Sequence, residues 1–284
     1  MIRPNGGPCY AQTADKSKDN NLKENNIDEA HSKARRLLAF TLNVPKEYLI
    51  INNEKELSKQ DFEYYKNYIT RLINGEPIQY IIGKQEFMGI EFNVNKDVLI
   101  PQPDTEILVE ETIKIAKEYN KPKVLDLCTG SGAIAVSIKK YVPEAEVFAS
   151  DISIKALQLA KINNIDNNIN FIESNLFENI NNEFDIIVSN PPYIRTEEIK
   201  SLSKEVQNEP LIALDGGQDG LDFYRDIIKQ AHNYLKSNGK LCLEIGDEQK
   251  DAITQILKSN FNYTNIKYYK DLQGNDRVII AEKM

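Results

Sequence analysis

The segment KVLDLCTGSGAIA, Lys123–Ala135, decides the fold of this chain. Its first part, KVLDLC, is a mostly apolar run with the length of a buried strand. Its last part opens the helical run SGAIAVSIKKYV. The turn between them contains Gly130 and Gly132, which let the backbone bend tightly and approach a ligand without a clash from a Cβ atom. A strand, a glycine turn and a helix form the unit at which an open α/β sheet binds its ligand.

Strands and helices alternate from this segment to the C-terminus. Further strands are expected in AEVFASD, INFIES, FDIIVSN and GKLCLEIG, and further helices in SIKALQLAKINN, DGLDFYRDIIKQAHNYL and DEQKDAITQILKSN. Alternation of this kind predicts a mostly parallel sheet with helices on both faces. The last two β-runs, YTNIKYY and DRVIIAEKM, have no helix between them, and a short connection joins antiparallel neighbours. The predicted fold class is therefore α/β, with a seven-stranded, mostly parallel Rossmann-like sheet and an antiparallel last strand.

A small helical domain is expected ahead of the sheet. Residues 1–26 are polar and rich in Asn, Lys and Asp, so a disordered leader is expected there. Residues 27–84 carry apolar residues at helical spacing in DEAHSKARRLLAFTLNV and SKQDFEYYKNYITRLI. Ser58 is placed to cap the second of these helices, and Gly75 is placed to end it.

A hairpin is expected to join the helical domain to the sheet. Residues 85–100 alternate apolar and polar side chains around Gly89, which predicts a β-hairpin linker. Residues 101–284 then make up the domain that contains the sheet.

Composition and charge limit the classes of protein to which the chain can belong. The 284 residues carry a net charge of −8 and a sequence pI near 5.1, whereas a domain that coats nucleic acid usually has a basic footprint. Cys9, Cys128 and Cys242 are scattered and form no CxxC pair, which suits a reducing compartment and predicts no metal site. No apolar run is long enough to cross a bilayer, and the N-terminus lacks the apolar stretch of a secretory signal. A cytoplasmic protein without a membrane segment is expected.

Polar residues follow the second and third strands, where an open sheet binds its ligand. Asp151 ends the second strand, about twenty residues beyond the glycine turn, where an acid can accept hydrogen bonds from both hydroxyls of a ribose. The turn is neither G-x-G-x-x-G nor a P-loop, and a nucleoside without a strong phosphate cradle fits S-adenosylmethionine. Asn175 and Leu176 follow the third strand and are placed to contact an adenine. The competing interpretations are a helix N-cap for Asp151 and a turn residue for Asn175.

The segment VSNPPYI, Val188–Ile194, ends the fourth strand beside the first. Two consecutive prolines offer carbonyl groups but no N–H, and the side chain of Asn190 adds a third carbonyl acceptor. Clustered acceptors of this kind suit the two hydrogens of a planar NH₂ group, and Tyr193 offers a face on which that group can stack. Held in this way, the nitrogen can be aimed at a sulfonium methyl by positioning and electrostatics. The competing interpretation is a double-proline end to a strand.

These motifs resemble a known family. VLDLCTGSGAIA, VFASDIS, SNLFE and VSNPPYI resemble the class I S-adenosylmethionine-dependent methyltransferases that modify planar nitrogens. Two segments ahead of that core, GEPIQYIIGKQEFMGIEFNV and VLIPQPDTEILVE, are similar to the glutamine N5-methyltransferases that act on peptide chain release factors. The segments EPLIALDGGQDGLDFYRDI, LEIGDEQ and DLQGNDRVI, which follow NPPY, share this similarity. The resemblance covers the chain from about residue 28 to the C-terminus.

The resemblance implies a reaction and a set of site residues. The implied cofactor is S-adenosyl-L-methionine, with S-adenosyl-L-homocysteine as product. The implied substrate is the glutamine of the Gly-Gly-Gln motif in class 1 peptide chain release factors, which the helical N-terminal domain would dock. The resemblance assigns the catalytic corner to Asn190, Pro191, Pro192 and Tyr193. It assigns cofactor binding to Cys128, Thr129, Gly130, Ser131, Gly132, Asp151, Asn175, Leu176, Asn190, Thr105 and Glu106.

The segment PDTE, Pro103–Glu106, is expected by the same resemblance to form a loop over the methionine end of the cofactor. Four positions depart from the usual family pattern. Gln102 stands where the family usually has Arg, Cys128 where it has Gly, Asn175 where it commonly has Asp, and Met88 where it often has Trp. None of these departures changes the NPPY residues.

Three other functions compete with methylation of release factors. The first is methylation of a glutamine in a ribosomal protein, which uses the same chemistry. The second is methylation of a base amine in nucleic acid, which calls for a basic cleft and a base-flipping pocket, and the net charge of −8 counts against it. The third is a binding module without catalysis, which would require a damaged NPPY or cofactor turn. We expect a monomer that forms no stable complex with nucleic acid and does not enter a membrane.

Overall fold

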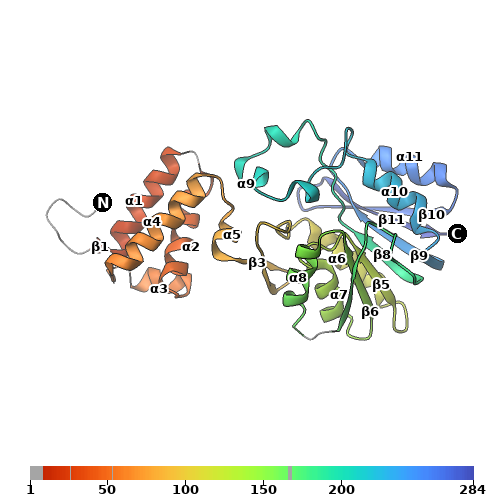
Figure 1. Ribbon diagram of the computed structural model, residues 1–284, viewed down its shortest axis with the longest axis horizontal. Coiled ribbons are helices and arrows are strands. Elements are labelled where there is room, and N and C mark those ends of the chain that lie inside the picture. Colours follow the sequence, from red (N-terminus) through yellow and green to blue (C-terminus); the bar gives the residue numbers. More distant parts are fainter. Residues whose placement is uncertain (1–8, 26, 53, 166–167) are drawn as a thin grey trace. The chain divides into compact units, whose positions relative to one another are not determined.

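The computed structural model describes residues 9–25, 27–52, 54–165 and 168–284, and the chain folds into two compact units (Figure 1). The helical unit comprises the chain up to Gly83 together with Ser203–Asn208. The sheet unit comprises Lys84–Leu202 and Glu209–Met284. A short segment that follows NPPY in the sequence therefore belongs to the helical unit rather than to the sheet.

The helical unit is built around α2 and α4. Its elements are β1 Cys9–Tyr10, α1 Ala11–Glu24, α2 Ala30–Thr41, α3 Lys46–Ile51, β2 Glu56–Leu57, α4 Lys59–Ile73, α5 Ile78–Ile82 and α9 Lys204–Gln207. The side chain of Ser58 accepts a hydrogen bond from the backbone N–H of Asp61 over 3.0 Å, which confirms the expected cap of α4. The fully buried Tyr65 of α4 donates its hydroxyl hydrogen to the carbonyl of Ala34 in α2 over 3.2 Å. This buried polar bond fixes the facing of the two helices.

The prediction of a disordered leader over residues 1–26 is wrong for the part of that segment that the structure describes. Ala11–Glu24 is the helix α1, and Leu22 and Ala14 are 0% and 2% exposed in the core of the helical unit. Two apolar residues eight positions apart lie on one helical stripe, and they suffice to bury this face although the segment is polar on average. Asp19, also buried, is paired with Lys23 over 2.9 Å. Residues 1–8 and 26 lie outside the described residues.

The sheet unit contains the seven expected strands in the order β10-β11-β9-β8-β5-β6-β7. Strands β5 to β9 run parallel, and β11 inserts antiparallel between β9 and β10, so the predicted fold class is confirmed. The strands are β5 Lys123–Leu127, β6 Glu146–Asp151, β7 Ile169–Glu173, β8 Phe184–Ser189, β9 Leu235–Glu244, β10 Tyr263–Lys270 and β11 Asp276–Lys283. The helices are α6 Thr105–Ala116, α7 Ala133–Tyr141, α8 Ile154–Asn163, α10 Asp222–Ala231 and α11 Lys250–Asn260, with short 3₁₀ turns at Ile199–Ser201 and Leu211–Ala213.

Each central strand supplies apolar side chains to two separate cores. Val124 of β5 belongs to the core on the side of α6 and α7, whereas its neighbour Leu125 belongs to the core on the side of α10 and α11. Ile186 and Ile187 of β8 divide in the same way. Successive side chains of a strand point to opposite faces, so a strand buried on both sides carries consecutive apolar residues. Because β5 pairs in parallel with both β8 and β6, the carboxyl ends of the three strands lie at one edge of the sheet (Figure 1).

The expected hairpin is present as β3 Lys84–Phe87 and β4 Ile90–Asn93, in the sheet unit. Its turn residues Met88 and Gly89 both have positive φ, 49° and 62°, as a two-residue hairpin turn requires. The side chain of Asn163 in α8 ties the hairpin to the glycine turn. Its Oδ1 accepts from the N–H of Asn93 over 2.8 Å, and its Nδ2 donates to the carbonyl of Ser131 over 2.9 Å.

Candidate active site

A cavity of about 240 Å³ lies in the sheet unit at the carboxyl ends of β5, β6, β7 and β8. The sequence predicted a ligand crevice at this edge, where the parallel strands of an open sheet end. Four segments that follow these strands line it, and they contain Cys128–Ser131, Asp151–Ser153, Ser174–Leu176 and Asn190 with Pro192. Segments far apart in the sequence therefore meet around one hollow.

A buried carboxylate supports the glycine turn from below. Asp126 is 0% exposed, and its Oδ2 accepts hydrogen bonds from the hydroxyl of Thr129 over 2.5 Å and from the N–H of Ala135 over 3.1 Å. Burial raises the pKa of this carboxyl group to about 7, against the effect of these two hydrogen bonds. Sequence reasoning missed this role, and the signal available was a charged residue inside an otherwise apolar strand.

The turn itself is held in left-handed backbone conformations. Gly130 and Gly132 have φ of 53° and 81°, and Cys128 has φ of 62° although it carries a side chain. A Cβ atom added at Gly130 would meet no atom within 4 Å, so open space lies beside its backbone. One added at Gly132 would lie 3.0 Å from the Cβ of Ala160, so this glycine permits close packing against α8 and does not line the cavity. Burial raises the pKa of the Cys128 thiol, which is therefore not an activated nucleophile.

Asp151 ends β6 and faces the turn across the cavity edge. Its Oδ2 accepts from the N–H of Gly130 over 2.9 Å, and its Oδ1 accepts from the N–H of Ser153 over 2.8 Å. Burial raises its pKa, and these backbone hydrogen bonds oppose that rise. Because it lines the cavity, its carboxylate is available to further donors from a ligand.

Asn175 and Leu176 line the cavity beyond β7. The Nδ2 of Asn175 donates to Glu178 over 2.9 Å, so its Oδ1 is the end of the amide that is free to accept from a ligand. Leu176 has φ of 47°, and its carbonyl accepts from the hydroxyl of Ser174 over 2.7 Å, which holds this uncommon backbone conformation. The turn presents an apolar side chain next to an amide acceptor.

The NPPY corner reaches the cavity through two of its four residues. Asn190 and Pro192 line the cavity, whereas Pro191 and Tyr193 do not. The side chain of Asn190 donates from its Nδ2 to the hydroxyl oxygen of Thr105 over 3.1 Å. The backbone behind the corner is closely approached by Gly216, where an added Cβ would lie 2.7 Å from the Cα of Tyr193 and 2.9 Å from the carbonyl oxygen of Pro192.

The structure does not bring the ring of Tyr193 to the cavity wall as a stacking face. Tyr193 packs against the core on the side of α10, and its carbonyl accepts from the Nε2 of Gln249 over 2.9 Å. Burial raises the pKa of its phenol. The aromatic side chains that line the cavity are Phe223 and Phe87, which sequence reasoning missed. Phe223 follows the DGLD segment at the start of α10, where helical spacing indicated only packing.

The segment expected to be a loop at 103–106 is partly helical. Thr105 and Glu106 form the first turn of α6 after Pro103 and Asp104, because the run TEILVEETIKIA carries apolar residues at helical spacing. Thr105 lines the cavity, but Glu106 does not. Instead, its Oε1 accepts from the N–H of Met88 over 2.6 Å and supports the hairpin turn.

The remaining wall of the cavity comes from segments that the sequence did not single out for binding. The residues are Asp97, Val98, Leu99, Pro101 and Gln102 beyond the hairpin, and Ile212 with Ala213 in the second 3₁₀ turn. The Nε2 of Gln102 donates to the carbonyl of Ile100 over 3.0 Å, so this residue stabilises its own loop while it lines the cavity. The available signal was the apolar run DVLIP, which ends in a proline directly after the hairpin.

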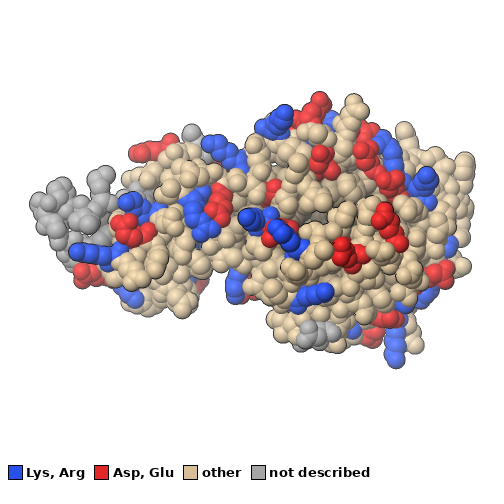
Figure 2. All heavy atoms as spheres, viewed as in Figure 1, with Lys and Arg blue, Asp and Glu red and all other residues tan. Residues whose placement is uncertain are grey.

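Two classes of site find no support in the part of the chain that the structure describes. The described residues contain no group of three or more His, Cys, Asp or Glu side chains that could hold a metal ion. Among the same residues, no helix has the length and apolar character needed to cross a membrane. On the face of the sheet unit that Figure 2 shows, basic and acidic side chains are interspersed.

The chain matches two family models. The methyltransferase small domain matches residues 103–208, and the PrmC N-terminal domain matches residues 19–83. In structure it is similar to a methyltransferase from Pyrococcus furiosus, with a TM-score of 0.51 and 18% identity over 77% of this chain and 98% of that chain. That similarity supports the fold alone.

Curated relatives narrow the assignment. A release factor glutamine methyltransferase from Clostridium acetobutylicum is 42% identical over 92% of this chain and 94% of its own length. A bifunctional methyltransferase from Rickettsia felis is also 42% identical, over 89% of this chain, but the match spans only 54% of that protein. The match to the first of these extends along nearly the full length of both chains. The chain therefore belongs to the release factor glutamine methyltransferase family.

Proposed function

We propose that this chain transfers a methyl group from S-adenosyl-L-methionine to the side-chain amide nitrogen, N5, of the glutamine in the Gly-Gly-Gln motif of class 1 peptide chain release factors. The observation that carries the proposal is that Asn190 and Pro192 line the same cavity as Gly130 and Asp151. A corner that offers hydrogen-bond acceptors therefore shares one hollow with a turn and an acid suited to a nucleoside. Family membership supplies the substrate class.

The residues around the cavity fit the cofactor. The open space beside Gly130 leaves room for a ligand against the backbone, and Asp151 has acceptor capacity for the two hydroxyls of a ribose. The free Oδ1 of Asn175 can accept from the exocyclic amine of adenine, and Leu176 can pack against its ring. When bound, the cofactor supplies an electrophilic methyl group on a sulfonium centre.

The proposed role of the NPPY corner is to hold the substrate amide. The Oδ1 of Asn190 and a proline carbonyl accept the two hydrogens of the glutamine NH₂ group. With both hydrogens held, the lone pair of the nitrogen is directed toward the methyl carbon. As the N–C bond forms, the bond between that carbon and the cofactor's sulfur would break with its electron pair going to sulfur, and one proton of the nitrogen would be released to bulk water as the products leave. The apolar wall around the corner, which includes Leu99, Ile212 and Phe223, excludes water from the reacting atoms.

We further propose that the helical unit docks the body of the release factor, and that the chain acts as a monomer in the cytoplasm without a stable nucleic-acid partner. The net charge of −8 and the interspersed charges in Figure 2 support a protein substrate over nucleic acid.

The proposal is tested with methyl-labelled cofactor and four potential acceptors. These are a purified class 1 release factor, the same factor with its Gly-Gly-Gln glutamine changed to alanine, a ribosomal protein fraction and DNA. We expect label in the intact release factor and none in its alanine variant. Label in the ribosomal fraction alone would identify a ribosomal protein as the substrate in place of a release factor. Label in DNA alone would overturn the proposal of a protein substrate.

A further inference from the structure

Glu244, a buried acid at the end of β9, lies beside the proposed catalytic corner but outside the cavity wall. In the parallel pairing of β8 with β9, Ser189 is opposite Leu243, so the next residues along, Asn190 and Glu244, leave the sheet at the same level. Glu244 is 2% exposed, and its Oε2 has no hydrogen-bond partner among the described residues. Resting on the proposed function, we propose that Glu244 is a positioning residue that sets the orientation of the Asn190 carboxamide.

The orientation of the Asn190 carboxamide decides which group it offers to a substrate. An amide has a donor end and an acceptor end of nearly the same shape, and only the surrounding hydrogen bonds decide which way it faces. In this protein the Nδ2 of Asn190 donates to the hydroxyl oxygen of Thr105 over 3.1 Å. The side chains of Thr105 and Asn190 both act on Glu244 as hydrogen-bonding neighbours. An ionised carboxylate accepts hydrogen bonds only, so the end of Asn190 that faces Glu244 must be the NH₂ group.

The consequence concerns the opposite end of the same amide. With its Nδ2 donating to Thr105 and turned toward Glu244, Asn190 keeps its Oδ1 for the substrate. A glutamine NH₂ group needs an acceptor at this place, and a flipped Asn190 would present a second donor to it. The buried carboxylate of Glu244 therefore selects, from two amide orientations of nearly the same shape, the one in which the Oδ1 of Asn190 faces the substrate.

Arg277 of β11 stabilises this arrangement from the other side. Its Nη2 lies 3.1 Å from the Oδ2 of Asp271 and 3.3 Å from the Oδ2 of Asp104, the residue before Thr105. Val278, the next residue, pairs with Glu244 across β9 and β11. The guanidinium group thus holds the start of α6, which carries Thr105, next to the end of β9.

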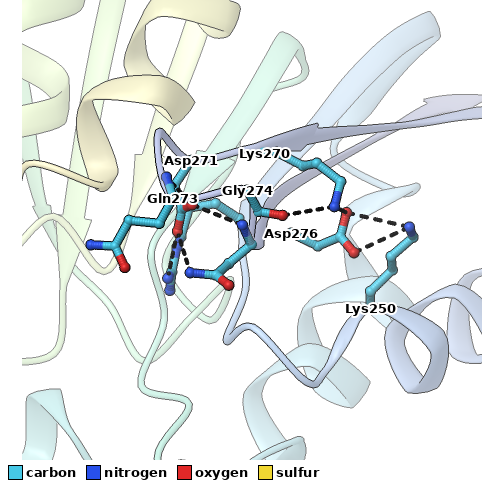
Figure 3. Close-up of polar contacts among 8 residues, drawn as sticks. Lys250, Lys270, Asp271, Gln273, Gly274 and Asp276 are labelled. Carbon is cyan, nitrogen blue, oxygen red and sulfur yellow. Dashed lines mark hydrogen bonds and ion pairs between the residues drawn. The ribbon is translucent and has the colours of Figure 1, made fainter.

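The turn before β11 holds Arg277 through Asp271, and Figure 3 shows the polar contacts of this turn. The Oδ1 of Asp271 accepts from the backbone N–H of Gln273 over 2.9 Å and from that of Asn275 over 2.8 Å. Asp276 lies between Lys250 and Lys270 (Figure 3), with its Oδ2 3.2 Å from the Nζ of Lys250. A turn braced in this way presents Asp271 to Arg277 with little freedom to move.

The charged and titratable groups around Glu244 decide how it responds to pH. They are Arg277 from β11, Asp104 before α6, Tyr193 from the corner and Tyr224 from α10. Burial raises the pKa of Glu244 to about 7, against the hydrogen bond from Thr105 and the charge of Arg277. The ionised form, which requires the productive orientation of Asn190, therefore increases as the pH rises through neutrality.

The test compares the wild-type chain with Glu244→Gln and with Glu248→Gln, a matched change at an exposed acid four residues further along. Methyl transfer to a release factor is measured from about pH 6 to about pH 8, a window centred on neutrality. The affinity for S-adenosylhomocysteine is measured by calorimetry at each pH. We expect Glu244→Gln to lower kcat roughly 10- to 100-fold, because a neutral amide no longer dictates which end of Asn190 faces the substrate. Its affinity for S-adenosylhomocysteine should remain that of the wild type.

The pH profile separates positioning from a merely structural role. Wild type and Glu248→Gln should share a rise of kcat with pH near neutrality, and Glu244→Gln should lack it. An unchanged kcat, or a lowered kcat with the rise intact, would overturn the inference. Should Glu244→Gln fail to fold, Thr105→Val takes its place, since valine removes the hydroxyl that accepts from Asn190. Thr105→Val must lower kcat and flatten the rise of kcat with pH, and a wild-type kcat or an intact rise would overturn the inference. A wild-type chain that methylates no release factor would instead count against the proposed function.

Discussion

Thr129 donates its hydroxyl hydrogen to the Oδ2 of Asp126 over 2.5 Å, beneath the backbone on which we propose that the cofactor rests. Asp126, which supports the turn through Thr129, is thus not among the residues that line the cavity. Burial raises the pKa of this acid to about 7, so its carboxylate becomes charged in the folded protein near neutral pH.

Asp126→Asn should change the dependence of stability on pH. Between the ordinary pKa of an aspartate and its raised value, this buried acid is protonated in the folded chain but ionised in the unfolded chain. The stability of the wild type therefore falls as the pH rises from about 4 to about 7, by up to about 1.4 kcal/mol per pH unit from this group. Asparagine keeps the acceptor for Thr129 but cannot ionise. Urea unfolding at the two ends of this window should show the variant gaining stability relative to the wild type as the pH rises; a constant difference would contradict this assignment.

Asn190→Ala should abolish methyl transfer and leave the cofactor bound. The substitution removes the Oδ1 proposed to hold the substrate amide, and loss of one such acceptor costs about 100-fold or more in kcat. Single-turnover methylation measures the loss, and calorimetry with S-adenosylhomocysteine measures binding. If cofactor affinity fell by the same factor, Asn190 would have to be reassigned to cofactor binding.

Gly216→Ala should damage the corner without touching the cavity. The new methyl group would lie 2.7 Å from the Cα of Tyr193 and 2.9 Å from the carbonyl oxygen of Pro192, so the proline backbone must shift. A displacement of about 1 Å at reacting groups can cost on the order of 100-fold in rate. We expect kcat to fall while the affinity for S-adenosylhomocysteine stays within about threefold of wild type. Full activity would mean that the corner tolerates movement that the proposed chemistry forbids.

Leu22→Ala should destabilise the helical unit if α1 is part of its core. Leu22 is fully buried, and truncation of such a residue costs about 2 to 5 kcal/mol. Leu272 is fully exposed in the turn before β11, so Leu272→Ala is the matched control, with an effect within about 0.5 kcal/mol. Chemical denaturation of the full chain gives both values. Equal stabilities of the two variants would mean that α1 does not contribute to the core of the helical unit.

The sheet could be predicted because its signals are strong and local. Val124, Leu125, Ile186 and Ile187 lie in mostly apolar strands, and the helices between the strands carry apolar residues at helical spacing. The position of Asp151 at the end of β6 follows from that order alone.

Other features depend on tertiary contacts that no local pattern announces. Helix α1 has a polar composition, and the burial of Ala14 and Leu22 shows why it is ordered. Glu106 is adjacent to Thr105, yet the direction of α6 turns it to the N–H of Met88 and away from the cavity. Tyr193 shares a tetrapeptide with Asn190, but successive residues of a sharp corner face different surroundings.

The assignment of Ser203–Asn208 to the helical unit has a consequence for any exchange of parts between relatives. Asn208 donates from its Nδ2 to the carbonyl of Gly75 over 3.0 Å, and Glu205 pairs with Lys33 over 2.6 Å, so this short segment is built into a body formed mainly by the N-terminal residues. A chimera cut once, after Gly83, would combine the helices of one parent with the α9 of the other. A graft of the N-terminal body must therefore carry two separate pieces of the chain, and selection on one piece constrains the other.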